Sequence, residues 1–170
     1  MRFLVLGCGS IGSRHAINLR TLGHDIYIYD QDPQRMTQLQ ARIPCSVYNY
    51  TSTHIPMDAW IICTPPELHV GFAMKALENN CHVFIEKPIA VSLDGVDELI
   101  EKAKARGLVA TVGYQLRFNA GLQKFKELID NKTFGGLYHV YSEYGNYLPD
   151  WHPQEDYRLG YTAYTGITLD

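Results

Sequence analysis

The hydrophobic positions of this chain form short runs that alternate with longer amphipathic stretches. The short runs predict strands, and the apolar character of most of them is typical of strands buried on both faces of a parallel sheet. The expected strands are 2–6, 25–30, 46–48, 59–63, 82–85 and 109–114. The amphipathic stretches predict helices at 13–22, 33–42, 67–79 and 92–106. Strands that alternate with helices predict an α/β fold, a doubly wound parallel sheet covered by helices on both faces.

The expected helix at 92–106 carries one apolar stripe. Its apolar positions recur every three or four residues, which places them on the face that would pack against the sheet. They are Leu93, Val96, Leu99, Ile100 and Ala103. We expect this helix to begin at Ser92 and to end at Gly107.

The pattern changes near Phe118, so we expect a first domain at 1–118 and a partial second domain at 119–170. In the second domain, residues 119–132 predict a helix and residues 137–148 predict a long strand. A strand without a partner in its own chain is expected to pair with another chain. Seven of the 12 tyrosines lie from Tyr138 onward, and tyrosine is enriched at interfaces. The sequence therefore predicts a homo-oligomer that is built through residues 137–148.

A glycine-rich segment links the first expected strand to the first expected helix. Gly7, Gly9 and Gly12 form a G-x-G-x-x-G pattern between the two, a context that predicts a dinucleotide site. Gly7 would make the tight turn, Gly9 would let a pyrophosphate approach the backbone, and Gly12 would let helix and strand pack closely. Ser10 and Ile11 would offer free N–H groups to the phosphates. The alternative is a glycine-rich turn that binds no ligand.

The end of the second expected strand bears on which dinucleotide binds. Asp30 lies 18 residues after Gly12 (30 − 12), close to the roughly 20 expected for the residue that binds the adenosine ribose. Its carboxylate would accept bonds from the ribose hydroxyls and repel a 2′-phosphate, which predicts NAD rather than NADP. Arg35 lies close by and would weaken that preference, because an arginine can hold a 2′-phosphate. Alternatively, Asp30 only opens a turn, although Asp32 already supplies the cap of the following helix.

Composition and charge exclude several classes of function. The chain has 170 residues, a net charge of −3 and a pI of about 6.1, so it offers no basic surface for nucleic acid or an anionic membrane. Its apolar runs are too short to span a membrane and we find no signal peptide, so we expect a cytoplasmic protein. The four cysteines share no pairing motif. We expect reduced core thiols, with metal ligation a distant second.

Four stretches of the chain together resemble the glucose–fructose oxidoreductase/inositol dehydrogenase family (Gfo/Idh/MocA). They are the glycine loop at 7–12, Cys63-Thr64-Pro65-Pro66 with His69, Glu86-Lys87-Pro88, and Gly113-Tyr114 with Arg117-Phe118. The resemblance implies an N-terminal Rossmann domain followed by an open-sheet domain with both helices and strands, here an incomplete α+β domain. It also implies NAD(P)-dependent redox chemistry on hydroxyl groups of sugars, cyclitols or sugar nucleotides.

The resemblance implies roles for single residues, each of which has a structural alternative. Lys87 would hydrogen-bond the substrate hydroxyl whose carbon exchanges hydride, or else it is a solvated lysine. Glu86 would lie at the nicotinamide side or merely pair with a neighbouring cation, and His69 would contact the cofactor or support the fold. Pro88 occupies a position that can hold a cis peptide bond. The expected cofactor set is Gly7, Gly9, Ser10, Ile11, Gly12, Asp30, Arg35, Cys63, Thr64, Pro65, Pro66, His69, Glu86, Lys87, Gln115 and Arg117.

The end of the chain departs from the family pattern. Family members continue through a Gly-rich segment into an Asp and, shortly afterwards, a His that acts as acid–base. Here Thr165–Leu169 resembles a shortened form of that segment and the chain stops at Asp170, our second catalytic candidate. We therefore expect a natural truncation, a fragment or a degraded gene product that is impaired as an oxidoreductase when it acts alone. The alternative is a non-catalytic nucleotide-binding or assembly module.

Overall fold

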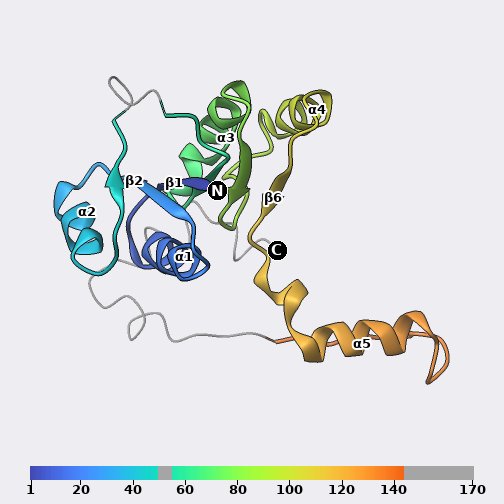
Figure 1. The fold of residues 1–170 in the computed structure, drawn as a ribbon. Coiled ribbons are helices and arrows are strands. Elements are labelled where there is room, and N and C mark those ends of the chain that lie inside the picture. Colours follow the sequence, from blue (N-terminus) through green and yellow to red (C-terminus); the bar gives the residue numbers. More distant parts are fainter. Residues whose placement is uncertain (50–54, 144–170) are drawn as a thin grey trace. The chain divides into compact units, whose positions relative to one another are not determined.

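The computed structural model describes residues 1–49 and 55–143 and divides the chain into two compact units, 1–113 and 114–170. The first unit is a parallel sheet with strand order β3-β2-β1-β4-β5-β6 (Figure 1). Its strands are β1 (Arg2–Leu6), β2 (Asp25–Tyr29), β3 (Ser46–Val47), β4 (Ala59–Ile62), β5 (His82–Ile85) and β6 (Ala110–Val112). Because β1 pairs with both β2 and β4, the strand order reverses there, and open α/β sheets bind ligands beside such a reversal.

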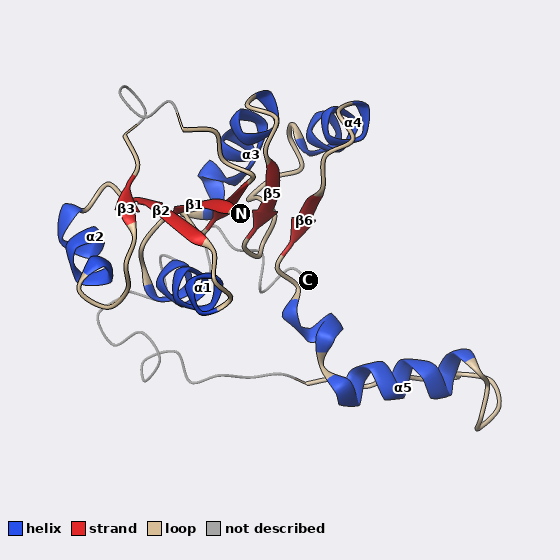
Figure 2. Ribbon diagram, in the orientation of Figure 1, coloured by secondary structure: helices blue, strands red, loops and turns tan. Residues whose placement is uncertain are grey.

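Helices cover both faces of this sheet (Figure 2). They are α1 (Ser10–Thr21), α2 (Pro33–Gln40), α3 (His69–Glu78) and α4 (Val96–Ala105), with a short 3₁₀ helix η1 (Pro66–Leu68) before α3. Leu4 and Leu6 point to the layer that contains α3 and α4, whereas Val5 points to the layer that contains α1 and α2. A strand with apolar neighbours on both sides must be apolar throughout. The predicted doubly wound fold is confirmed.

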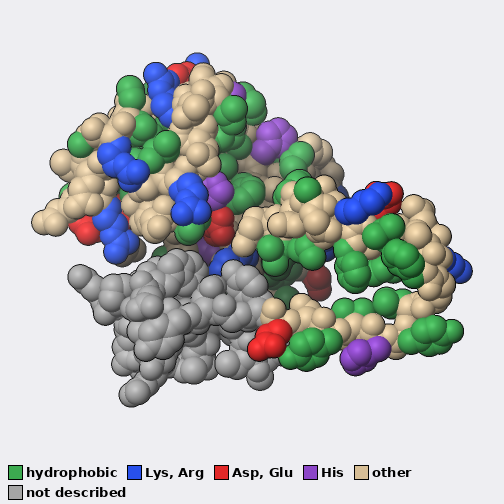
Figure 3. All heavy atoms as spheres, turned by 90° about the horizontal axis from the view of Figure 1, so that it is seen from below, with side chains coloured by type: hydrophobic (Ala, Val, Ile, Leu, Met, Phe, Trp, Pro, Cys, Tyr) green, Lys and Arg blue, Asp and Glu red, His purple; other side chains and the backbone are tan. Residues whose placement is uncertain are grey.

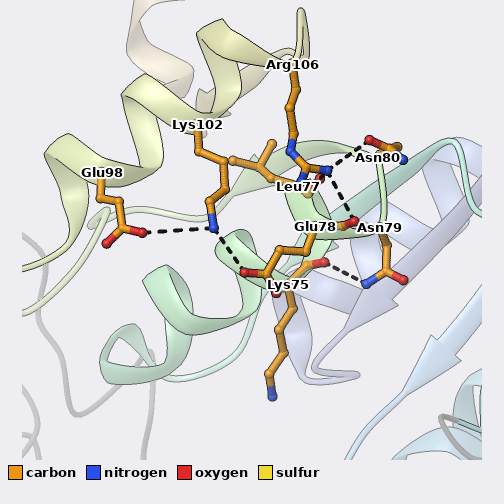
Figure 4. A network of polar contacts seen from close by, with 8 residues as sticks. All are labelled: Lys75, Leu77, Glu78, Asn79, Asn80, Glu98, Lys102 and Arg106. Carbon is orange, nitrogen blue, oxygen red and sulfur yellow. Dashed lines mark hydrogen bonds and ion pairs between the residues drawn. The ribbon is translucent and has the colours of Figure 1, made fainter.

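A polar network fixes the C-terminal end of α3 to α4 (Figure 4). Nη1 of Arg106 donates to the carbonyl oxygens of Leu77 at 2.9 Å and Glu78 at 3.3 Å, and to Oδ1 of Asn80 at 3.0 Å. Nζ of Lys102 lies 3.0 Å from Oε1 of Glu78. The last carbonyls of a helix have no partner inside it, and cations are favoured at that end. Arg106, which follows α4, therefore bonds the last carbonyls of α3, and Lys102 of α4 holds the same end of α3 through the side chain of Glu78.

The helix α4 begins at Val96, so the expected start at Ser92 is wrong. Gly95 has a φ of +77° and is the N-cap of α4, and the hydroxyl of Ser92 instead donates to the carboxylate of Asp94 at 2.9 Å. A left-handed residue cannot continue a right-handed helix, which is why the helix starts after it. The expected stripe is narrower as a result. Its buried members are Val96, Leu99 and Ala103, and its exposed members are Leu93 and Ile100.

The second unit contains the short 3₁₀ helix η2 (Gln115–Phe118) and α5 (Ala120–Asp130). The side chain of Asn119 caps α5 by accepting the N–H of Leu122 at 3.1 Å. None of the residues of α5 is buried, and hydrophobic side chains lie open on this helix and on the segment after it (Figure 3). The large exposed apolar residues include Leu122, Phe125, Phe134, Leu137, Tyr138, Val140 and Tyr141.

The strand expected at 137–148 is wrong over the part that can be described. Residues 137–143 form neither strand nor bridge, and residues 144–148 lie outside the described residues. A strand exists only when a neighbour takes up its N–H and C=O groups, and within the described residues no segment pairs with this one. No helix in residues 1–49 or 55–143 is long and apolar enough to cross a membrane.

Candidate functional site

The glycine loop lies between β1 and α1, and two of its glycines are required by the fold. Gly7 has a φ of +89°, and a Cβ there would lie 2.5 Å from the carbonyl oxygen of Cys63. A Cβ on Gly12 would overlap the carbonyl oxygen of Gly7. Gly9 differs, because its nearest neighbour would be Nη1 of Arg35 at 3.8 Å. The space beside Gly9 is open to a ligand, as the role expected for this glycine requires.

The N-terminus of α1 offers backbone donors beside that space. Gly9 is the N-cap residue and has no side chain to cap the helix. The N–H of Ser13 makes the first intrahelical bond, to the carbonyl oxygen of Gly9 at 2.9 Å. The N–H groups of Ser10, Ile11 and Gly12 precede that bond and have no partner within the helix. Free N–H groups at the positive end of a helix suit a phosphate group.

Asp30 follows β2 and holds the glycine loop in place. Its Oδ2 accepts the N–H of Cys8 at 2.6 Å, and its Oδ1 accepts the N–H of Asp32 at 2.8 Å. Asp30 therefore supports the turn, which is the alternative role that the sequence left open for it. Its ionised carboxylate can still accept hydrogen bonds from further donors, such as ribose hydroxyls. Burial, followed by the charge of Asp30, raises the pKa of the Cys8 thiol to about 12. Arg35 lies at the same loop, with its Nε 3.6 Å from Oδ2 of Asp32.

The segment after β4 contributes a buried hydroxyl. Among the described residues, Oγ1 of Thr64 is a buried atom without a hydrogen-bond partner. Buried polar atoms in proteins are almost always satisfied, so an unpaired hydroxyl at the end of a parallel strand fits contact with a bound polar group. Pro65 precedes η1 and Pro66 opens it, which stiffens this segment. Burial, then the charge of Glu86, raises the pKa of Cys63.

His69 is 1% exposed at the start of α3. Its Nδ1 lies 2.9 Å from the carbonyl oxygen of Pro88 and its Nε2 lies 2.8 Å from the carbonyl oxygen of Thr64. Both ring nitrogens therefore face acceptors of the protein itself, and the geometry favours the supporting role over contact with a cofactor. The imidazole ties the Thr64 segment to the segment after β5. The peptide bond between Lys87 and Pro88 is cis, as expected.

Glu86 follows β5 and pairs with His15, a residue that the sequence analysis missed. Nε2 of His15 on α1 lies 2.7 Å from Oε1 of Glu86, and Oε2 of Glu86 accepts the N–H of Lys87 at 3.2 Å. Burial acts to raise the pKa of Glu86, but the hydrogen bond and charge of His15, with the Lys87 contacts, outweigh it and hold this pKa below its usual value. The available signal was the spacing of His15, one turn after Gly12 on the same helix.

Lys87 is exposed at the carboxyl end of the sheet. Within the described residues, its ammonium group has no hydrogen-bond partner, so it is available to a ligand. Gly113 lies at the end of β6, where a Cβ would lie 2.9 Å from Cζ of Phe84 and 3.2 Å from Oε1 of Glu86. A glycine is needed there because the ring and the carboxylate fill the space.

The remaining expected site residues belong to the second unit. Gln115 and Arg117 lie in η2 with exposed side chains, and the carbonyl oxygen of Arg117 accepts Nε2 of Gln123 at 3.0 Å. Asp170 and the segment Thr165–Leu169 lie outside the described residues. The proposed roles of these residues stay predictions.

The segments that follow β1, β4 and β5 thus come together at one edge of the sheet. Gly7 packs against Cys63, His15 joins α1 to Glu86, and His69 joins the other two segments. Donors for a pyrophosphate, an acidic residue after β2 and an available lysine surround the strand reversal. This donor set fits a dinucleotide that extends across the edge.

Comparisons with known proteins agree with this geometry. Residues 1–114 match the family model for Gfo/Idh/MocA proteins, described as an oxidoreductase family with an NAD-binding Rossmann fold. The chain is 30% identical over 142 residues to myo-inositol 2-dehydrogenase of Thermotoga maritima, covering 79% of this chain and 42% of that protein. It is 32% identical to the NAD-dependent scyllo-inositol 2-dehydrogenase of Bacillus subtilis, with the same shares covered.

Among solved structures, the chain is similar to the WlbA dehydrogenase of Bordetella pertussis in complex with NADH and UDP-GlcNAcA. The TM-score is 0.72 at 26% identity, and the match covers 79% of this chain and 41% of that one. This chain thus spans about two fifths of the length of these relatives. The match to the family model extends over the whole sheet, the glycine loop and Glu86-Lys87-Pro88. The chain belongs to the Gfo/Idh/MocA oxidoreductase family, whose fold is an NAD-binding Rossmann fold.

Proposed function

We propose that this chain binds NAD(H) and supplies the cofactor domain of an oxidoreductase that acts on a hydroxyl group of a sugar, a cyclitol or a sugar nucleotide. The inositol dehydrogenases that it resembles support the substrate class. The observation that carries the proposal is the linkage of Lys87 to both halves of the site. On one side, the Glu86 carboxylate accepts the N–H of Lys87 and contacts His15 on α1. On the other side, the carbonyl oxygen of Pro88, the residue after Lys87, contacts the ring of His69.

In this proposal the described residues divide the work. The N–H groups at 10–12 hold the pyrophosphate, the carboxylate of Asp30 accepts the adenosine ribose hydroxyls, and the Thr64 hydroxyl contacts the nicotinamide half. NAD supplies the hydride acceptor when it is bound. The ammonium of Lys87 donates a hydrogen bond to the substrate oxygen and stabilises negative charge on it while the carbon loses hydride. Arg35 beside the glycine loop moderates the preference for NAD over NADP.

We propose that the 170-residue chain alone turns over little or no substrate. A positioned acid–base contributes about 10²–10⁴-fold to such a reaction, and none of the residues described at this site fills that role. The test is NADH production from a panel of polyols, sugars and UDP-sugars. The wild-type chain is expected to show none above background. Steady turnover that Lys87→Met abolishes and the exposed control Lys104→Met preserves would contradict the impairment and support the role of Lys87.

The second candidate function is a non-catalytic nucleotide-binding or assembly module, and the exposed apolar side chains of the second unit favour it. Leu137 is 59% exposed, Tyr138 98% and Tyr141 78%, which is unusual for a monomer surface. We propose that residues 137–148 associate with a second copy. Light scattering is expected to show a dimer or larger assembly for the whole chain and a smaller species for the chain ending at Phe118. Two monomers at micromolar concentration would contradict this.

A further inference from the structure

The contact between His15 and Glu86 joins α1 to the segment after β5. Nε2 of His15 and Oε1 of Glu86 lie 2.7 Å apart, and their side chains are 29% and 17% exposed. The His15 ring also meets the Phe84 ring at a centroid distance of 5.1 Å with an angle of 63°. The absence of a side chain at Gly113 leaves room for both Phe84 and Glu86. The pair is held from α1, β5 and the end of β6.

The charge of this pair depends on one proton. Among the described residues, the charged and titratable groups that act on it are Lys87, whose N–H bonds Glu86 and whose positive charge lowers the pKa of Glu86, and Cys63 at the end of β4. Cys63 stays a neutral thiol because burial raises its pKa. Glu86 is ionised. The pair therefore carries no net charge when the His15 imidazole is protonated and one negative charge when it is not.

The position of the pair relates this charge to the nicotinamide. In a doubly wound dinucleotide fold each half of the sheet holds one nucleotide, and the pyrophosphate lies at the reversal between the halves. Asp30 after β2 marks the adenosine half. Glu86 follows β5 in the other half, where the nicotinamide would lie when the cofactor is bound. The nicotinamide ring carries a positive charge in NAD⁺ and none in NADH, whereas the adenosine and the phosphates are the same in both.

We propose that the His15–Glu86 pair sets the relative affinity of this site for NAD⁺ and NADH through the protonation state of His15. The inference rests on the proposed function, since it requires that the chain bind both cofactor forms. The neutral imidazole leaves the negative charge of Glu86 unbalanced, which favours NAD⁺. The protonated imidazole cancels that charge and removes the advantage. By linkage, NAD⁺ binding expels the proton of His15 more strongly than NADH binding does.

Coulomb's law sets the size of the effect. One unit charge about 8 Å from another, at an effective dielectric constant of about 40, changes a dissociation constant about five-fold. The ratio Kd(NADH)/Kd(NAD⁺) of the wild-type chain is therefore expected to be about five-fold higher at a pH where the His15 imidazole is neutral than at a pH where it is protonated.

Calorimetric titration of the whole chain with NAD⁺ and with NADH, at a series of pH values, tests this. The variant His15→Gln keeps an N–H donor for Glu86 but cannot gain a charge, so its ratio is expected to stay at the high-pH value of the wild type. Glu86→Gln removes the negative charge, so its ratio is expected to be about five-fold lower than that of the wild type at high pH, where His15 is neutral in both proteins. Urea unfolding of each variant checks that it is folded.

Each outcome has a defined meaning. A wild-type ratio that is flat with pH, while both cofactors bind, overturns this inference and leaves the proposed function intact. A ratio for His15→Gln that still follows the wild-type profile also overturns it, because another group then titrates. Failure of both NAD⁺ and NADH to bind overturns the proposed function and the inference with it. If His15→Gln does not fold, the pH profile of Glu86→Gln decides. A profile with the same midpoint as that of the wild type overturns the inference, because loss of the carboxylate must shift the protonation of an imidazole that is paired with it.

Discussion

Alanine at Gly9 and at Gly12 separates the glycine that a ligand needs from the glycine that the fold needs. Gly9 has an extended backbone, with φ −67° and ψ −168°, and a Cβ there meets nothing closer than Nη1 of Arg35 at 3.8 Å. The cost of Gly9→Ala is therefore that of a poorer helix cap, about 1 kcal/mol. A Cβ on Gly12 overlaps the carbonyl oxygen of Gly7, so α1 must move away from β1. Overpacking costs about 1–3 kcal/mol, and a backbone neighbour puts Gly12→Ala at or above about 3 kcal/mol.

Urea unfolding and NADH titration of the two variants test this contrast. Gly9→Ala is expected to unfold near the wild-type midpoint but to bind NADH at least about tenfold more weakly, a loss of about 1.4 kcal/mol, because its methyl group occupies the space beside the pyrophosphate. Gly12→Ala is expected to lower the urea midpoint by about 1–2 M, given a slope of about 2 kcal/mol/M. The reasoning is refuted if Gly12→Ala is as stable as the wild type, or if Gly9→Ala binds NADH with wild-type affinity.

Three further predictions follow from single contacts. Arg106→Leu removes the guanidinium donor from the carbonyl oxygens of Leu77 and Glu78, although the Leu77 carbonyl keeps the N–H of Asn80, and is expected to cost about 1–3 kcal/mol of unfolding free energy in urea. Lys104→Leu, at an exposed ion pair, is expected to stay within about 0.5 kcal/mol. Equal losses would contradict this. The wild-type chain is expected to bind NADH more tightly than NADPH, by about 1–3 kcal/mol, and Asp30→Ala is expected to reduce this difference in binding free energy. Equal affinities of the wild-type chain for NADH and NADPH would contradict the predicted preference for NAD. Because the pKa of Glu86 is lower in the folded than in the unfolded chain, the unfolded chain binds more protons at acid pH. The free energy of unfolding is therefore expected to fall as the pH drops below the pKa of an ordinary glutamate, and to fall less in Glu86→Gln. The same acid profile of stability for both proteins would contradict the contacts assigned to Glu86.

The sequence was sufficient wherever a local pattern decided the structure. The strands β1, β4 and β5 were recognisable because burial on both faces demands a run of apolar residues, which is interrupted only by Arg2 and His82 at the first positions of β1 and β5. The glycine spacing identified the turn after β1, since Gly7 and Gly12 are both required by backbone contacts that no other residue allows. The parallel, doubly wound arrangement followed from the alternation of strands and helices.

Contacts between distant segments could not be predicted from local patterns. The start of α4 depends on the left-handed Gly95, and the absence of a strand at 137–143 depends on whether a partner segment is present. The partners of His69 and His15 lie in the segments that follow β4 and β5, so spacing alone could not assign their roles. A pattern shows which side chains share a face, whereas long-range partners are set by the packing of the whole sheet.

The most direct test of the account is to locate NADH on the chain. In a ¹⁵N-labelled sample, the amide signals of Ser10, Ile11 and Gly12 are predicted to shift saturably as NADH is added, because these N–H groups would bond the pyrophosphate. The amides of Thr64 and Lys87 are predicted to shift with them, and that of Arg106, which follows α4, is predicted to stay unchanged. The absence of saturable shifts at residues 10–12, or shifts centred on α4 instead, would contradict the claim that this edge of the sheet is the dinucleotide site.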